Sequence, residues 1–203
     1  VDPSIELFKN ILKERGLQTA VLHIEDLALD HEILSRKHQD ELYSTYDQIL
    51  IKAAQQNVTI ISLHLDAEKI ATNDFSQIPY PTNTDKETYL YLGGAQIILD
   101  SRNISTESLQ LAHNLIFSDF FSLIQDKGIS VRPTYSSRLR LQSNISMYLA
   151  GSSKGGAALI ELGALDELKR LFDTPDAIAE NLYQPLAEVA IIISDHRKSL
   201  WLK

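Results

Sequence analysis

Apolar residues recur along the chain with two alternating spacings, one typical of helices and one typical of strands. The helical spacing covers residues 5–15, 41–56, 105–127, 165–172 and 175–196. The strand-like runs cover residues 19–24, 58–65, 89–99, 129–132 and 157–161. Because helices and strands alternate, the sequence predicts an α/β fold of three layers, a mainly parallel sheet with helices on both faces. No repeat and no linker interrupts the pattern, so residues 1–203 are expected to form a single domain.

Turn-forming and polar residues separate these segments. Gly16 and Gly128 each follow a predicted helix, where glycine is the usual residue. Residues 66–88 are polar and irregular, which predicts a long surface loop, and we expect it to border the functional site. Residues 136–144 are interpreted as a polar connector, and Pro185 as a kink or a restart of the last helix.

Composition excludes several classes of function. The net charge is −8, from 27 acidic and 19 basic residues, which disfavours a nucleic-acid partner. The chain has no cysteine, so a thiol nucleophile is excluded and a catalytic metal would need His, Asp or Glu ligands. No apolar run approaches the ~18 residues of a transmembrane helix. The first residues, 1–4, indicate a cut point or a domain edge rather than a signal peptide.

Two polar residues lie near the ends of predicted buried strands, where sites gather in α/β sheets. His64 ends the run 58–65, and Glu161 ends the run 157–161. A neutral imidazole is a common zinc ligand, and a neighbouring carboxylate can act as a general base. By position alone, a hydrogen-bonded structural histidine is the commoner interpretation of His64. A carboxylate that caps the next helix explains Glu161 about as well as catalysis does.

Other polar clusters receive a structural interpretation. Residues 151–156, Gly-Ser-Ser-Lys-Gly-Gly, lack the order of a phosphate-binding P-loop, and an ordinary mobile loop is favoured. The spacing of His23, His31 and His38 favours a solvated surface over a metal cluster. His196, near the end of the last helix, is expected to interact favourably with the helix dipole as a cation.

Two stretches resemble the zinc-dependent N-acetylmuramoyl-L-alanine amidases. Residues 51–66, Ile-Lys-Ala-Ala-Gln-Gln-Asn-Val-Thr-Ile-Ile-Ser-Leu-His-Leu-Asp, resemble the family's helix and the strand ending Ser-Ile-His-Ala-Asn, whose histidine binds zinc. Residues 158–163, Ala-Leu-Ile-Glu-Leu-Gly, resemble its Leu-Val-Glu-Leu-Gly strand, whose glutamate is catalytic. His64 and Glu161 fall on these two positions. The flanking segments follow in the family's order, and the sporulation amidases of the same fold are a more distant likeness.

The resemblance implies a fold, a cofactor and a substrate. It implies a zinc ion, with His64 as a metal ligand and Glu161 as the catalytic carboxylate. The implied substrate is peptidoglycan or a muropeptide, cleaved at the amide that joins the muramic acid lactyl group to L-alanine. A periplasmic or extracellular location follows from the same likeness.

The chain also departs from the family's pattern. The family's first zinc ligand is a histidine in Asp-Pro-Gly-His-Gly, whereas residues 1–4 read Val-Asp-Pro-Ser and no histidine precedes His23. Glu6 is the one candidate for the family's second ligand, on a shortened segment. Three protein ligands are the norm for catalytic zinc. The chain is therefore either cut after the first ligand segment or a domain that has lost its metal site.

The residues and the resemblance together allow three functions. The first is a zinc amidase, and the second is a non-catalytic amidase-like module that binds the cell wall or a protein partner. The third is an unrelated α/β hydrolase or small-molecule-binding domain. The absence of a Gly-x-Ser-x-Gly motif counts against a serine hydrolase.

Overall fold

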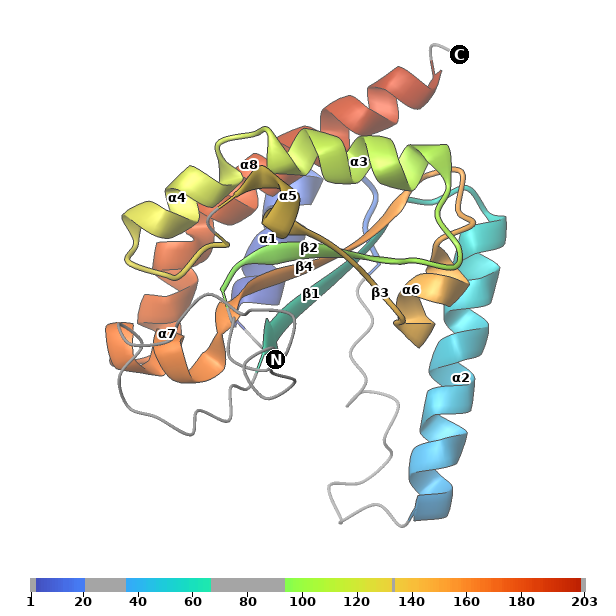
Figure 1. The fold of residues 1–203 in the computed structure, drawn as a ribbon, viewed down its shortest axis with the longest axis horizontal. Helices are drawn as coiled ribbons and strands as arrows, with labels where there is room; N and C mark the ends of the chain where they lie inside the picture. The colour runs from blue at the N-terminus through green and yellow to red at the C-terminus, as the bar shows by residue number, and fades with distance from the viewer. Residues whose placement is uncertain (1–2, 21–35, 67–93, 133, 202–203) are drawn as a thin grey trace.

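A computed structural model describes residues 3–20, 36–66, 94–132 and 134–201 of this chain (Figure 1). The helices are α1 (Pro3–Glu14), α2 (Arg36–Gln55), α3 (Thr106–Ile116), α4 (Phe120–Asp126), α5 (Tyr135–Arg138), α6 (Ile145–Ala150), α7 (Leu165–Leu171) and α8 (Pro175–Trp201). The strands are β1 (Ile60–Asp66), β2 (Gln96–Asp100), β3 (Leu139–Gln142) and β4 (Ala157–Ala164). Within this part of the chain, no helix is both long enough and apolar enough to cross a membrane.

The four strands form one sheet in the order β1-β4-β2-β3. β1 is parallel to β4 and β2 is parallel to β3, while β2 and β4 are antiparallel. Figure 1 shows α3, α4 and α8 on one side of this sheet and α6 and α2 toward the other. The predicted α/β class, with a mainly parallel sheet between helices, is therefore confirmed.

The main hydrophobic core lies on the α3, α4 and α8 face. From β4 it takes Ala158, Ile160 and Leu162, and from β1 Ile61, Leu63 and Leu65 pack against it. Successive side chains of a strand point to opposite faces. Consequently the intervening residues of β1 and β4, His64 and Glu161 among them, point to the other face.

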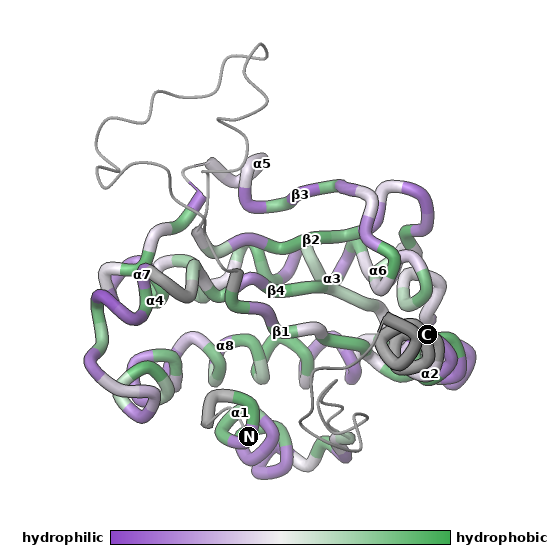
Figure 2. The backbone as a smooth tube through the Cα atoms, turned by 90° about the horizontal axis from the view of Figure 1, so that it is seen from below, coloured by the Kyte–Doolittle hydropathy of each residue, from purple (hydrophilic) through white to green (hydrophobic). Residues whose placement is uncertain are grey.

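That other face carries a smaller apolar cluster at one end only. Ala157 and Leu159 of β4 pack there with Ile98, Met147 and Ala150, and Ile60 packs against them. Figure 2 views the sheet with β3, β2, β4 and β1 side by side and shows hydrophobic colouring over much of β2 and β4. The second layer of helices thus packs on the first residues of β1 and β4. The later residues of these strands, His64 and Glu161 among them, are not part of this apolar cluster.

Several predicted elements differ from those observed. The single helix expected over residues 105–127 is two helices, α3 and α4, because Ser118 interrupts the backbone ladder. Its hydroxyl donates to the Leu115 carbonyl at 2.9 Å and accepts from the Phe120 N–H at 3.2 Å. A serine hydroxyl competes in this way with helical hydrogen bonds, and apolar spacing does not reveal it.

The sheet also differs at its β3 edge. The strand predicted over 129–132 makes only an isolated bridge between Val131 and Ala95. The predicted connector 136–144 contains most of α5 and all of β3, which pairs with β2. β3 is an edge strand whose residues are half-buried or exposed, so it lacks the apolar run on which the prediction relied. α8 continues through Pro185 without a restart.

Four predicted helices are confirmed in position, and two other predicted segments lie largely outside the described residues. The helices expected at 5–15, 41–56, 165–172 and 175–196 correspond to α1, α2, α7 and α8. Most of the strand expected at 19–24, and the loop expected at 66–88 from residue 67 on, are outside the described ranges.

Candidate functional site

His64 and Glu161 are direct neighbours across two strands. Their Cα atoms are register partners in the parallel pairing of β1 and β4. Register partners point to the same face of a sheet, and adjacent strands are ~4.8 Å apart. His64 is exposed and Glu161 is only 6% exposed. The structure therefore brings together the two site residues that the sequence predicted, a buried carboxylate beside an accessible imidazole.

A backbone irregularity follows this pair at once. The register shifts between His64 and Asp66, whose partners on β4 are Glu161 and Ala164. Gly163 lies in the shifted segment with φ +141°, a value that L side chains rarely adopt. Bulges of this kind bend a strand and redirect side chains beside functional sites. Glu161 is also three residues short of the end of β4, so it does not cap α7, whose N-cap is Ala164.

Gln96 extends the row of polar residues to a third strand. It pairs with Glu161 in the antiparallel register of β2 and β4, and its side chain is 2% exposed. Its amide Nε2 donates a hydrogen bond to Glu161 Oε2. The sequence interpretation missed this residue, although it is a single amide within the buried run 95–99. A polar residue in such a run needs a hydrogen-bonding partner, and this was the available signal.

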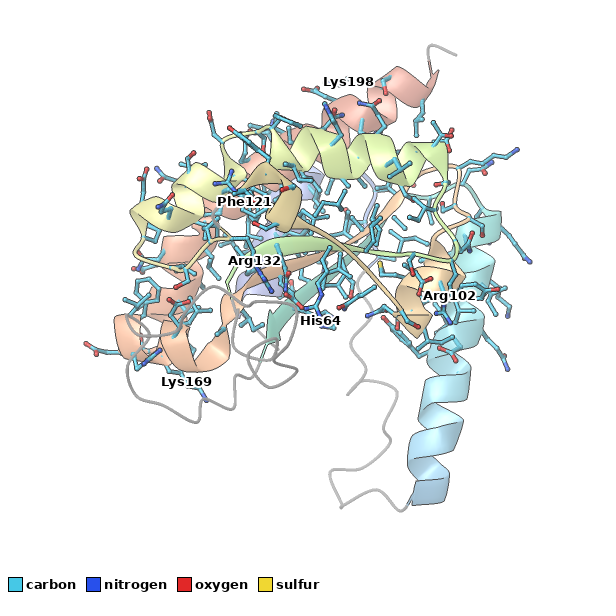
Figure 3. All side chains as sticks on the ribbon, in the orientation of Figure 1. His64, Arg102, Phe121, Arg132, Lys169 and Lys198 are labelled. Atoms are coloured by element: carbon cyan, nitrogen blue, oxygen red, sulfur yellow. The ribbon has the colours of Figure 1, made fainter. Side chains whose placement is uncertain are left out.

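Arg132 continues the same row at the next backbone. The bridge between Ala95 and Val131 is parallel, which places Arg132 next to Gln96 on the same face. In Figure 3 the side chains of His64 and Arg132 lie on the same side of the sheet. The carbonyl of Arg132 accepts a hydrogen bond from Arg138 Nε at 3.0 Å, which fixes its backbone. The face therefore presents, in order, an imidazole, a carboxylate, an amide and a guanidinium.

Tyr46 on α2 marks the covered end of this face. Its hydroxyl hydrogen-bonds with Ser62, which is two residues before His64 on β1, and with Ser146 on α6. Burial raises the pKa of the Tyr46 phenol above its ordinary value. The phenol thus stays neutral at physiological pH and joins two elements beside the site.

Glu6 is placed away from the His64–Glu161 pair. α1 packs chiefly on α8, and its Phe8, Ile11 and Leu12 join the main core. The Glu6 carboxylate accepts a hydrogen bond from Lys9 Nζ at 3.2 Å. The structure does not bring Glu6 to His64, which faces the opposite side of the sheet from the main core.

The described residues do not complete a zinc site. They contain no group of three His, Cys, Asp or Glu side chains placed to hold a metal ion. His64 and Glu161 are two adjacent donor residues, whereas catalytic zinc takes three protein ligands. His23 and His31 lie outside the described residues, and of His38 only the backbone, in α2, is described. The side chains available for chemistry on this face are therefore those of the row His64, Glu161, Gln96 and Arg132.

The segment 151–156 is a hydrogen-bonded turn in which only Ser152 and Lys154 are exposed. Ser153 is fully buried, and its hydroxyl joins the Val58 carbonyl to the Gly155 N–H. His196 is 1% exposed, and its Nε2 lies 3.1 Å from the Gly155 carbonyl oxygen. The mobile loop expected from the sequence is instead a hydrogen-bonded turn, and His196 is buried against it, while the favourable interaction of His196 with the helix dipole stays a prediction. Sequence spacing alone could not show that this turn and the end of α8 are buried against one another.

Comparison with known proteins points to one group of structures. No protein-family profile matches the sequence, and no curated protein matches it. The apo N-acetylmuramyl-L-alanine amidase Ami1 of Mycobacterium abscessus is similar in structure, with a TM-score of 0.53 and 13% identity over 94% of this chain and 74% of that one. The chain has the fold of these amidases.

Two further structures support this assignment of the fold. The Mycobacterium smegmatis amidase Ami1 has a TM-score of 0.53 and 14% identity, over 95% of this chain and 74% of that one. The CwlD amidase of Clostridioides difficile, solved in complex with the GerS lipoprotein, has a TM-score of 0.50 and 15% identity over 98% of this chain and 83% of that one. The amidase fold inferred from the two motifs is thus found independently by structure.

Proposed function

We propose that this chain is an amidase-type hydrolase of peptidoglycan, which cleaves the amide between the muramic acid lactyl group and L-alanine. The observation that carries the proposal is the register pairing of His64 with Glu161 on one face of the sheet. These are the two residues that fall on the family's ligand and catalytic motifs. The amidases of the same fold supply the substrate class.

The described residues suggest a division of labour. Glu161 accepts a proton from a water as that water's oxygen bonds to the amide carbonyl carbon. The C–N bond then breaks, and the same proton passes to the leaving amine. His64, exposed beside Glu161, donates an N–H to the carbonyl oxygen as negative charge develops there. Water is consumed, and the products are the lactyl acid and a peptide with a new amino terminus.

The proposal extends to surroundings and partners. An enzyme that acts on peptidoglycan works outside the cytoplasm, in the periplasm or at the cell exterior. The CwlD structure contains a lipoprotein, so a protein partner is a reasonable second expectation for this chain. Weak zinc binding at His64 is a separate proposal that rests on the resemblance, and metal analysis tests it; the steps above do not use the ion. A non-catalytic module that binds the cell wall is the competing function.

The test is peptide release from purified peptidoglycan sacculi, followed by mass spectrometry of peptides with a free L-alanine amino terminus. We expect Glu161→Gln to lower the rate by at least about 100-fold, since loss of a general base removes a factor of 10² to 10⁴. Glu180→Gln, at an exposed carboxylate on α8, is the matched control and should keep the rate within about twofold. Release that survives Glu161→Gln contradicts the assigned base. Sacculus binding without release by the wild-type chain favours the non-catalytic module.

A further inference from the structure

Gln96 is a buried polar residue in an otherwise apolar stretch of β2. Ala95, Ile97, Ile98 and Leu99 are at most 2% exposed, and Gln96 has the same exposure. Burying an amide costs free energy unless hydrogen bonds replace its lost contacts with water. The Nε2 of Gln96 has such a bond to Glu161. Its Oε1 is buried and has no hydrogen-bond partner among the described residues. The amide is thus committed to Glu161 rather than to a general stabilising network.

The pairing of the strands also determines which side chains flank Glu161. Glu161 lies between His64 on β1 and Gln96 on β2, both in register with it. An amide nitrogen that donates to Oε2 restricts rotation of the Glu161 carboxylate plane. The reverse amide orientation would turn a carbonyl oxygen toward a charged carboxylate and is unfavourable.

We propose that Gln96 is a positioning residue of the site, which orients the carboxylate of Glu161 through the Nε2 to Oε2 hydrogen bond. The inference rests on the proposed function, because it assigns Gln96 a part in the same amide hydrolysis. It differs from a structural role in one respect. An apolar replacement would fill the buried position but would remove the amide that donates to Oε2 of Glu161.

The first test uses Gln96→Leu, with Gln142→Leu as matched control on the edge strand β3, where Gln142 pairs with Asp100. We expect kcat for peptide release to fall by about 10- to 100-fold, with KM within about twofold of wild type. Gln96→Glu, which sets a second carboxylate against Glu161 and offers it no N–H donor, should lower kcat at least as far. A folded Gln96→Leu chain with wild-type kcat overturns the proposal.

The second test does not require activity. Crystal structures of the wild type, Gln96→Leu and Gln142→Leu give the orientation of the Glu161 carboxylate. We expect its plane to rotate or to lose a single orientation in Gln96→Leu and to keep the wild-type orientation in Gln142→Leu. An unchanged carboxylate orientation in Gln96→Leu overturns the positioning role. If wild type releases no peptide, the proposed function fails while this comparison still decides the role of Gln96. If Gln96→Leu does not fold, Gln96→Asn, whose shorter side chain removes the same bond, serves in both tests.

Discussion

Asp100, at the end of β2, shows how one carboxylate fixes two loops. It is 1% exposed and accepts hydrogen bonds from Arg102 Nε at 2.9 Å and Arg102 Nη2 at 2.7 Å. It also accepts from the backbone N–H of Arg102 at 2.8 Å and of Asn144 at 2.6 Å. The Arg102 guanidinium lies over the ring of Tyr148 on α6. The hydrogen bonds from Arg102, with the backbone N–H groups, hold the pKa of Asp100 well below its ordinary value.

We expect Asp100→Asn to lower the free energy of unfolding by about 2 kcal/mol at neutral pH, because charge-assisted hydrogen bonds to a buried carboxylate are lost. The folded-state pKa is depressed, so this contribution is present above the unfolded pKa of about 4 and is lost as pH falls below it. Urea denaturation between pH 7 and pH 3 measures the difference between the two chains. A difference that grows toward acid pH would contradict the assignment.

At the scale of elements, the turn 151–156 ties the start of β4 to the start of β1. A Cβ built on Gly155 would lie 2.3 Å from the backbone carbonyl atoms of Val58 and 2.6 Å from the amide nitrogen of Thr59. Thr59 Oγ1 donates to the Gly155 carbonyl at 2.7 Å. The two backbones approach so closely that no side chain fits at position 155, and glycine is therefore required there. This contact helps to set the register of β1 and β4, on which the pairing of His64 with Glu161 depends.

Gly155→Ala is expected to destabilise the fold by about 3 kcal/mol, because backbone atoms must move to admit the methyl group. Gly16→Ala is the control, since a Cβ there meets nothing within 4 Å and φ is +76°. That change introduces dihedral strain alone and should cost about 1 kcal/mol. Urea denaturation of both variants measures the contrast. Equal losses would show that the predicted clash at Gly155 is relieved locally.

Helices and strands were predictable where a continuous apolar pattern defines them. α1, α2, α7, α8, β1 and β4 follow the predicted segments closely because each buries an apolar face. α3 and α4 were merged in the prediction, since Ser118 breaks the ladder through a hydroxyl. β3 was missed because an edge strand buries too little surface to leave an alternating pattern. The local pattern therefore fails where side-chain hydrogen bonds or pairing partners decide the structure.

At the scale of the whole molecule, the site draws on segments that are far apart in sequence. β1, β4 and β2 contribute His64, Glu161 and Gln96, and the sheet order sets them side by side. The described part of the chain gives this row two residues that are common zinc ligands, and Glu6 does not join them.

We expect purified chain to hold zinc below one ion per molecule, because an imidazole and one carboxylate bind less tightly than a three-ligand site. Elemental analysis after equilibration with zinc measures this in wild type, His64→Ala and His113→Ala. His113, exposed on α3, is the matched control. Stoichiometric zinc that disappears in His64→Ala and persists in His113→Ala would show a complete metal site and contradict the prediction.

The sequence by itself determined the α/β class, most helix and strand locations, and the two motif residues. These follow from apolar periodicity and from motifs that are local in the chain. Only the tertiary structure decided that His64 and Glu161 are register partners, that Gln96 donates to Glu161, and that Glu6 lies elsewhere. The physical reason is that strand order and register depend on contacts between distant segments, such as Gly155 against Val58. No local pattern records those contacts.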